Sequence, residues 1–171
     1  MRWFRSSAGA ALFALAGAGL AVSGAHAEMI EAVTAEQLEA ALDEAGLDPS
    51  IILDADTGAP VGQGKAGEFL FFVRALSCSG APQACENLLF FANFNLGRAA
   101  TPRDYQIVNQ FNESQVFGRA YIIEGKNTVG VDYVIELGGG VSNDHLSENI
   151  GRWADVIAAF VTEFKEGHAG S

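Results

Sequence analysis

The sequence predicts a small α+β domain in which an antiparallel sheet packs against helices, in the order α-β-β-β-β-α-β-β-α. Two runs rich in Phe and Leu, 69–76 and 88–96, flank a short loop bounded by Cys78 and Cys85. This arrangement is typical of an antiparallel hairpin. Near the end of the chain, large apolar residues recur at alternating steps of four and three over 146–164, the period of an amphipathic helix.

The first 27 residues have the three parts of a secretory signal peptide. Arg2 and Arg5 form a basic start, residues 8–22 are an uncharged Ala/Gly/Leu run, and small residues precede Ala27. An uncleaved anchor would need about 20 strongly apolar residues, and this run is shorter and diluted by glycine. We therefore expect cleavage after Ala27 and a single mature domain, 28–171, that is periplasmic or secreted and has no stable membrane anchor.

The charge of the chain excludes one class of partner. The formal net charge is −11, and the cations between Lys65 and Lys165 are scattered singly. Neutralising a phosphate backbone requires clustered Lys and Arg. We expect no nucleic-acid binding.

The first mature element is a helix followed by two weak strands. Thr34 and Gln37 have the spacing of a capping box, and Gly46 ends the helix. Strand signals follow at 51–53 and around Val61, with a turn between them. These two strands precede the stronger pair described above.

The two cysteines are the only ones in the chain, and export to an oxidising compartment favours a disulfide between Cys78 and Cys85. The alternative is a metal site, but zinc needs four ligands and the remaining histidines are distant and isolated. A disulfide that closes the hairpin would place Val73 opposite Phe90. We expect no metal and no cofactor.

A helix, two strands and a last helix complete the domain. Thr101 caps the second helix, with proline at its first position. The strands are expected at 119–123 and 129–137, joined by a turn, and Ser142 caps the final helix. The small, polar tail 167–171 is expected to fray.

No catalytic constellation stands out. The glycines before Ser142 invite a phosphate-binding interpretation, but they lack the ending of a P-loop. Ser142, Asp144 and His145 are triad residue types, yet they crowd one helix start and lack a nucleophile elbow. We identify no catalytic residue and expect no enzymatic activity.

The two strong strands do not alternate between apolar and polar residues, as a sheet with one face in water would. Both sheet faces should therefore be covered. The second cover could be another subunit, a bound partner, a folded-back segment, or helices of the monomer itself. The candidate interaction surface comprises Phe69, Phe71, Phe72, Phe90, Phe91 and Phe94.

Three segments resemble the YbjN family of bacterial proteins, described as "putative sensory-transduction regulators". The residues that carry the resemblance are Asn109, Phe111 and Asn112; Phe117, Gly118, Arg119, Ala120 and Tyr121; and Gly139, Gly140, Val141 and Ser142 before a helix with Trp153. The cysteine pair before a Phe-rich strand resembles exported members. The chain departs from the family where Phe111 replaces a Trp and where Glu113, Gln115 and Val116 stand in place of basic residues.

The resemblance implies a fold similar to that of type III secretion chaperones, small α+β domains that often dimerise and hold segments of partners. It implies no reaction, cofactor or catalytic residue. We therefore expect an exported protein-binding or chaperone-like regulatory domain with a protein or peptide partner, and a homodimer is the second arrangement that the resemblance allows. A sensor accessory that binds a small apolar ligand is the alternative, and a hydrolase is a more distant one.

Arg119 is a charge in an otherwise apolar strand. A buried arginine needs a carboxylate partner, and Asp132 or Glu136 on the next strand could supply it. We favour an internal salt bridge over ligand binding by Arg119.

Overall fold

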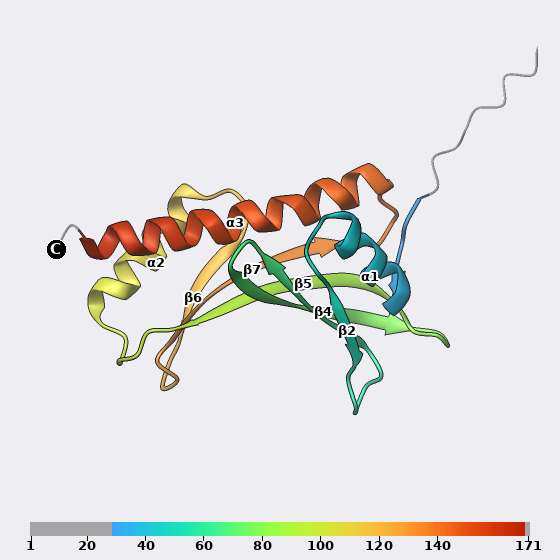
Figure 1. The fold of residues 1–171 in the computed structure, drawn as a ribbon, viewed down its shortest axis with the longest axis horizontal. Helices are drawn as coiled ribbons and strands as arrows, with labels where there is room; N and C mark the ends of the chain where they lie inside the picture. The colour runs from blue at the N-terminus through green and yellow to red at the C-terminus, as the bar shows by residue number, and fades with distance from the viewer. Residues whose placement is uncertain (1–28, 170–171) are drawn as a thin grey trace, which may run out of the picture.

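The computed structural model describes residues 29–169 (Figure 1). The predicted signal peptide and its cleavage site after Ala27 lie outside the described residues.

One antiparallel sheet and three helices make up the described chain, which confirms the predicted fold class. The sheet order is β2-β3-β4-β5-β7-β6, and β1 pairs with the start of β5. The elements are β1 (Val33–Thr34), α1 (Ala35–Glu44), β2 (Ser50–Leu53), β3 (Pro60–Ala66), β4 (Phe69–Ser79), β5 (Ala84–Asn95), α2 (Pro102–Ser114), β6 (Arg119–Ile123), β7 (Thr128–Glu136) and α3 (Asn143–Ala169). Their order is the predicted one, with the two-residue strand β1 added.

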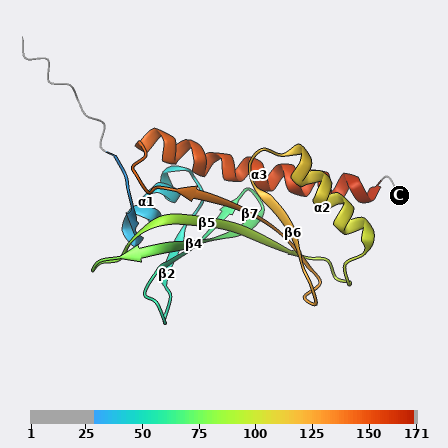
Figure 2. The same ribbon diagram turned by 180° about the vertical axis from the view of Figure 1, so that it is seen from behind.

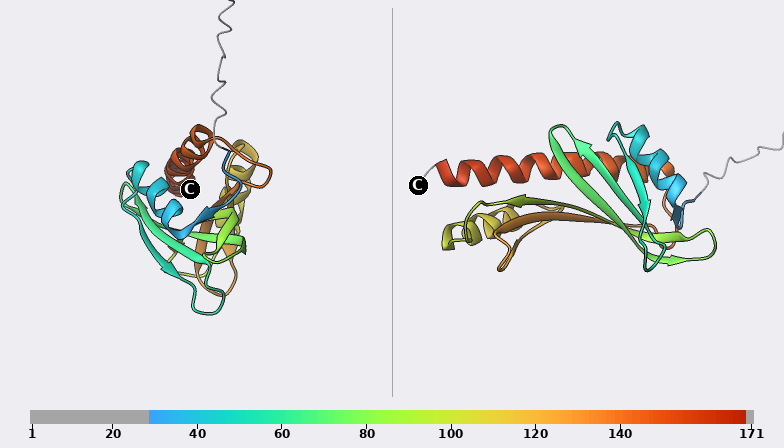
Figure 3. Two further views of the ribbon diagram at one scale, coloured as in Figure 1. Left: turned by 90° about the vertical axis from the view of Figure 1, so that its right-hand side faces the viewer. Right: turned by 60° about the horizontal axis from the view of Figure 1, so that its bottom comes forward.

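The three helices lie on one side of the sheet. Helix α3 runs along the length of the sheet, with α1 near one end and α2 near the other (Figures 1 and 2). Seen end-on, the sheet curves around α3 as a trough (Figure 3). The interpretation that helices of a monomer cover both faces is therefore wrong for residues 29–169, because all three helices lie on the same side.

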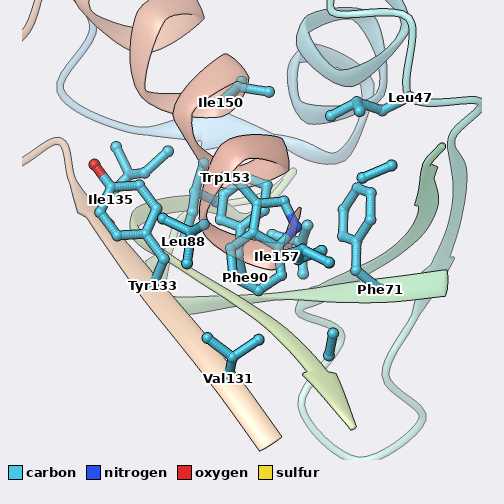
Figure 4. Packing of buried hydrophobic residues seen from close by; sticks show 14 of the residues in the cluster. Leu47, Phe71, Leu88, Phe90, Val131, Tyr133, Ile135, Ile150, Trp153 and Ile157 are labelled. Atoms are coloured by element: carbon cyan, nitrogen blue, oxygen red, sulfur yellow. The ribbon is translucent and has the colours of Figure 1, made fainter. Parts of the chain in front are cut away.

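The core fills the trough between α3 and the sheet. Trp153 is fully buried, and its ring centroid lies 6.0 Å from that of Phe71 and 5.9 Å from that of Phe90 (Figure 4). The predicted stripe on α3 supplies this contact: Leu146, Ile150, Trp153, Ile157 and Phe160 are buried. Truncating such an aromatic residue typically costs about 3–5 kcal/mol of stability.

Two glycines explain why strand β3 gave only a weak signal. A Cβ on Gly64 would lie 2.6 Å from Cζ of Phe71, and one on Gly62 would lie 3.1 Å from Cδ1 of Ile51. Glycine is unfavourable in strands in general, but here it makes room for larger neighbours. The strand therefore extends over Pro60–Ala66 although its sequence lacks a strong strand pattern.

The predicted hairpin and its register are confirmed. Val73 lies opposite Phe90, and Cys78 lies opposite Cys85 with a Cα–Cα distance of 3.9 Å. A disulfide joins the two cysteines. The strands extend to the cysteines, so the hairpin is longer than the apolar runs alone indicate.

All three helices begin directly after the predicted N-cap residues, Thr34, Thr101 and Ser142. The hydroxyl of Thr34 accepts a hydrogen bond from the backbone N–H of Gln37 at 3.3 Å. The side-chain oxygen of Gln37 accepts one from the backbone N–H of Thr34 at 2.9 Å. The hydroxyl of Ser142 accepts the N–H of His145 at 3.2 Å. Both caps satisfy N–H groups that lack partners within the helix.

The predicted fraying of the tail 167–171 is wrong for residues 167–169, because α3 continues to Ala169; residues 170–171 lie outside the described residues. The guanidinium of Arg103 donates to the carbonyl oxygen of Gly167 at 2.9 and 2.6 Å. A Cβ on Gly167 would lie 2.7 Å from Cγ1 of Ile107, so the glycine lets α3 approach α2 closely. Composition alone does not reveal this contact between distant segments.

Candidate functional site

The six phenylalanines of the predicted interaction surface divide between the two faces of the sheet. Phe71 and Phe90 are fully buried beneath the helices and belong to the core. Phe69 and Phe94 are half-buried on the same side, with ring centroids 6.1 Å apart. The prediction is wrong for Phe71 and Phe90, which have no exposed surface, because successive side chains of a strand point to opposite faces even when both are apolar. For the half-buried Phe69 and Phe94 it stays a prediction.

Phe72 and Phe91 lie on the other side, which we call the open face: the side of the sheet that faces away from α1, α2 and α3. Their rings stack with centroids 5.6 Å apart. Leu70 and Val134 are 45% and 47% exposed, and the half-buried Leu89 lies opposite Val134 in the register. We define the apolar patch of the open face as Leu70, Phe72, Leu89, Phe91 and Val134.

Arg74 is a positive charge beside this patch, and Asp132, which pairs with Arg119, lies opposite Phe91 in the register. The guanidinium carbon of Arg74 lies 5.9 Å from the centroid of the Phe91 ring. No carboxylate of residues 29–169 lies within salt-bridge distance of it. Hydrogen bonds from Thr57 hold the pKa of Asp54 below its usual value, and the positive charge of Arg74 lowers it further. Arg74 is thus available to a carboxylate brought by a partner.

A shallow cavity of about 550 Å³ lies at one end of the open face, between the β2–β3 turn and the β4–β5 hairpin. Polar and charged side chains line much of it, among them Asp54, Thr57, Arg74 and Gln83. Sites for small apolar ligands are lined mainly by hydrophobic and aromatic side chains. This cavity is too polar to resemble such a site.

Arg119 forms the predicted ion pair with the next strand, and its partner is Asp132. The Nη2–Oδ2 distance is 2.6 Å and the Nε–Oδ1 distance is 3.2 Å. The hydrogen bonds and charge of Asp132 raise the pKa of Arg119. The Arg119 side chain is 72% exposed, so solvent screens the pair and its contribution to stability is modest.

The segment Phe117–Tyr121 packs strand β6 closely against α3 and β7. Gly118 has a φ of +82°, and a Cβ there would lie 2.5 Å from Cγ1 of Val156. The ring of Tyr121 covers Gly130, where a Cβ would lie 2.5 Å from the ring. Gly118 and Tyr121 of this motif therefore have structural roles.

Phe117 is partly exposed at the start of the same segment. The guanidinium of Arg152 lies over its ring at 4.2 Å, and its ring centroid is 6.3 Å from that of Tyr133. Tyr133 donates a short hydrogen bond to the buried amide oxygen of Asn149, which Arg152 also reaches at 2.7 Å. Sequence analysis missed Asn149, because it is one polar residue among apolar ones on α3.

The remaining family-signature residues hold the ends of α2 and α3. Phe111 is fully buried, with its ring centroid 5.3 Å from that of Phe160, whereas Asn109 is exposed on α2. Gly139 and Gly140 have φ of +86° and +91° in the turn before α3, and Val141 bridges to Ile30. None of these side chains lies on the open face.

Asp104 is a second residue that sequence analysis missed. It is fully buried and accepts hydrogen bonds from Arg98 at 2.6 and 2.9 Å and from Thr101 at 2.7 Å through both its N–H and its hydroxyl. Nε2 of His168 lies 3.0 Å from its carboxylate. The spacing of Thr101 and Asp104 is that of a capping box, so the sequence carries a signal for the local part of this network.

The arrangement offers little for catalysis or metal binding. The Ser142 hydroxyl accepts a hydrogen bond from the backbone N–H of His145 as a helix cap, so it does not bond to the His145 ring there. Within residues 29–169, no group of three or more His, Cys, Asp or Glu side chains could hold a metal ion. No helix in that part of the chain is long and apolar enough to cross a membrane.

Comparison with known proteins agrees with this architecture. The family model for YbjN, described as "Putative bacterial sensory transduction regulator", matches residues 34–166. The chain belongs to the YbjN family. Its fold is similar to that in the crystal structure of YbjN, "a putative transcription regulator from E. coli", with a TM-score of 0.56, 14% sequence identity, and coverage of 82% of this chain and 96% of the other. At this identity, the likeness to the E. coli YbjN structure shows the fold alone.

No curated protein sequence matches the chain. Membership of the YbjN family is therefore assigned through the family model, and the fold agrees with it.

Proposed function

We propose that this YbjN-family chain is an exported, non-enzymatic regulatory domain that holds a segment of another protein on the open face of its sheet. The observation that carries the proposal is the apolar patch of Leu70, Phe72, Leu89, Phe91 and Val134 on a face without helices. Contiguous apolar patches that stay exposed usually mark interaction sites. A chaperone-like role follows, because such a surface would cover apolar side chains of a client.

The charges around the patch favour a different protein over a second copy of this chain. The chain has a net charge of −11, so two copies repel each other at low salt. Arg74 lies beside the patch, and no carboxylate of residues 29–169 is within salt-bridge distance of it. We therefore commit to a partner segment that combines apolar side chains with a carboxylate facing Arg74.

The alternatives have less support. A small apolar ligand would need an apolar cavity, and the cavity beside the open face is lined by Asp54, Arg74 and Gln83. A hydrolase would need a nucleophile hydrogen-bonded to an oriented base, and Ser142 is instead bound to a backbone N–H.

Peptide binding tests the proposal directly. The probes are two labelled peptides of equal length, one alternating leucine with glutamate and one alternating leucine with lysine. We expect the glutamate peptide to raise the fluorescence anisotropy with the wild type. Arg74→Glu should weaken binding by about tenfold or more, because it replaces an attraction by a repulsion. Val134→Asp should weaken it through the apolar patch.

Lys165→Glu is the matched control, since it makes the same charge change on α3, on the helix side of the sheet. It should leave peptide binding unchanged. Equal binding by wild type, Arg74→Glu and Val134→Asp would overturn the proposal. A wild-type dimer in light scattering that Val134→Asp converts to monomer would identify a second copy as the occupant, and the commitment to a different protein would be wrong.

Export is the second part of the proposal, supported by the basic and apolar leader and by the disulfide between Cys78 and Cys85. Mass spectrometry of the protein purified from its native host should show Glu28 as the N-terminal residue. The same sample should take up an alkylating reagent at Cys78 and Cys85 only after reduction, because an oxidising compartment keeps the pair closed. Met1 at the N-terminus together with free thiols would contradict export.

A further inference from the structure

The two edges of the sheet differ in how they meet solvent. At the β6 edge, the side-chain amide of Asn112 occupies the outward backbone groups of Ala120. Its Oδ1 accepts the Ala120 N–H at 2.8 Å, and its Nδ2 donates to the Ala120 carbonyl oxygen at 3.1 Å. These are the two bonds that an added strand would make at this residue. Helix α2 packs beside the same strand (Figure 2), so the β6 edge is closed at Ala120.

The β2 edge is open. Strand β2 is the first in the sheet order, and no other strand of residues 29–169 pairs with its outer side. In an antiparallel pair, residue pairs that hydrogen-bond to each other alternate with pairs that do not. The Asp54 N–H donates to the Ala59 carbonyl oxygen at 2.9 Å, so Asp54 and Ala59 are a hydrogen-bonded pair. Leu53 lies opposite Pro60, which has no N–H, so Leu53 is a residue that does not bond to β3.

Ile51 lies two residues before Leu53, so it too belongs to a pair that does not hydrogen-bond across the β2–β3 pair. The N–H and carbonyl groups of both residues point away from β3. The side chains of Ile52 and Leu53 are 65% and 62% exposed. The outer side of β2 thus combines unpaired backbone groups with apolar side chains, the combination that accepts an added strand.

Acidic residues lie at both ends of this edge. Asp43 and Asp48 line a surface groove before β2. Asp54 and Asp56 follow it in the turn to β3. Lys65 is 3.8 Å from Asp48, and its side chain is 61% exposed. Pairing of β2 with β2 of a second copy would bring these acidic ends together, which like charges oppose.

We infer that the β2 edge binds an extended segment of another protein by strand addition, and that the segment has alternating apolar residues between basic ones. The backbone groups of Ile51 and Leu53 supply the hydrogen bonds. The acidic ends select the basic flanks. This site is separate from the open face and has the opposite charge preference, so the two proposals can fail independently.

Hydrogen exchange followed by NMR tests strand addition at single residues. The probe is a blocked peptide of alternating valine and threonine between two lysines, and its control carries two glutamates instead. Saturation with the lysine peptide should slow the exchange of the Ile51 and Leu53 amide protons by about tenfold or more, because each N–H gains an acceptor. The Ile52 amide proton should change little, because it already bonds to β3.

Leu53→Pro removes one outward N–H without removing a bond to β3, and proline is tolerated at such edge positions. It should abolish protection at Ile51 by the lysine peptide. Asp48→Lys combined with Asp56→Lys is the second variant and leaves the β2 backbone intact. It should reverse the preference toward the glutamate peptide.

Unchanged exchange at Ile51 and Leu53 in the saturated wild type would overturn the inference. Equal binding of the lysine and glutamate peptides would do the same. Protection of these amides by self-association alone, without peptide, would show that the edge takes a second copy and would also contradict it.

Discussion

Phe90→Asp is expected to unfold the domain, whereas Phe91→Asp, at the next residue of β5, should leave it folded. Phe90 is fully buried against Trp153, so the new carboxylate would be unpaired in the core. Such a group costs several kcal/mol, comparable with the roughly 5–15 kcal/mol that holds a whole domain together. Phe91 is half-buried on the open face, opposite Asp132, so the carboxylate there can turn toward water and costs less than one in the core.

Circular dichroism and urea denaturation measure both variants. Phe71→Asp and Phe72→Asp repeat the comparison on strand β4, with Phe71 in the core and Phe72 stacked on Phe91 on the open face. Loss of structure in both members of a pair would mean that the open face is covered in solution. A natively folded Phe90→Asp variant would contradict the placement of the core.

Asp104→Asn should lower the free energy of unfolding by about 2–4 kcal/mol, because the amide cannot accept all the hydrogen bonds that the buried carboxylate accepts. The bonds affected come from Arg98, Thr101 and His168. Asp144→Asn is the matched control, since Asp144 is exposed in the first turn of α3. It should stay within about 0.5 kcal/mol of the wild type.

The same carboxylate gives stability a defined dependence on pH. Hydrogen bonds from Arg98, and next those from Thr101, hold the pKa of Asp104 well below its ordinary value, although burial opposes them. A carboxyl group whose pKa is lowered in the folded state stabilises the protein at pH values above its unfolded pKa of about 3.9. This stabilisation is lost as the pH falls through the folded pKa.

Wild-type protein should therefore lose stability below about pH 4 more steeply than Asp104→Asn. Thermal melts from pH 6 downward measure both slopes. Parallel acid slopes in the two proteins would show that Asp104 does not contribute as its contacts indicate.

Local pattern was enough to predict the elements whose contacts are close in sequence. The α3 stripe, the Thr34 and Ser142 caps and the register of Val73 with Phe90 all depend on neighbouring residues or on a single turn. The partner of Arg119 was found because Asp132 lies on the next strand. Each of these contacts leaves a short-range signature in the sequence.

Other features depend on contacts that no short window contains. Phe90 and Phe91 are neighbours in a strand and so lie on opposite faces, but a run of apolar residues does not show which of the two faces the helices. Glycine at position 64 weakened the β3 signal because its role is to admit Phe71. The pairing of Asp104 with His168 spans 64 residues, and only the tertiary structure brings the two side chains together.

The closed β6 edge limits how the sheet can grow. When both edges of a sheet are free, one edge of each molecule can pair with the other edge of the next molecule, which builds an open-ended assembly. Here the Asn112 amide occupies the outward backbone groups of Ala120 at the β6 end of the sheet order, which opposes addition of a strand there. If β2 takes a guest strand, copies of this chain cannot also be joined through Ala120 of β6, and raising the concentration is expected to fill β2 sites rather than to lengthen a stack of copies.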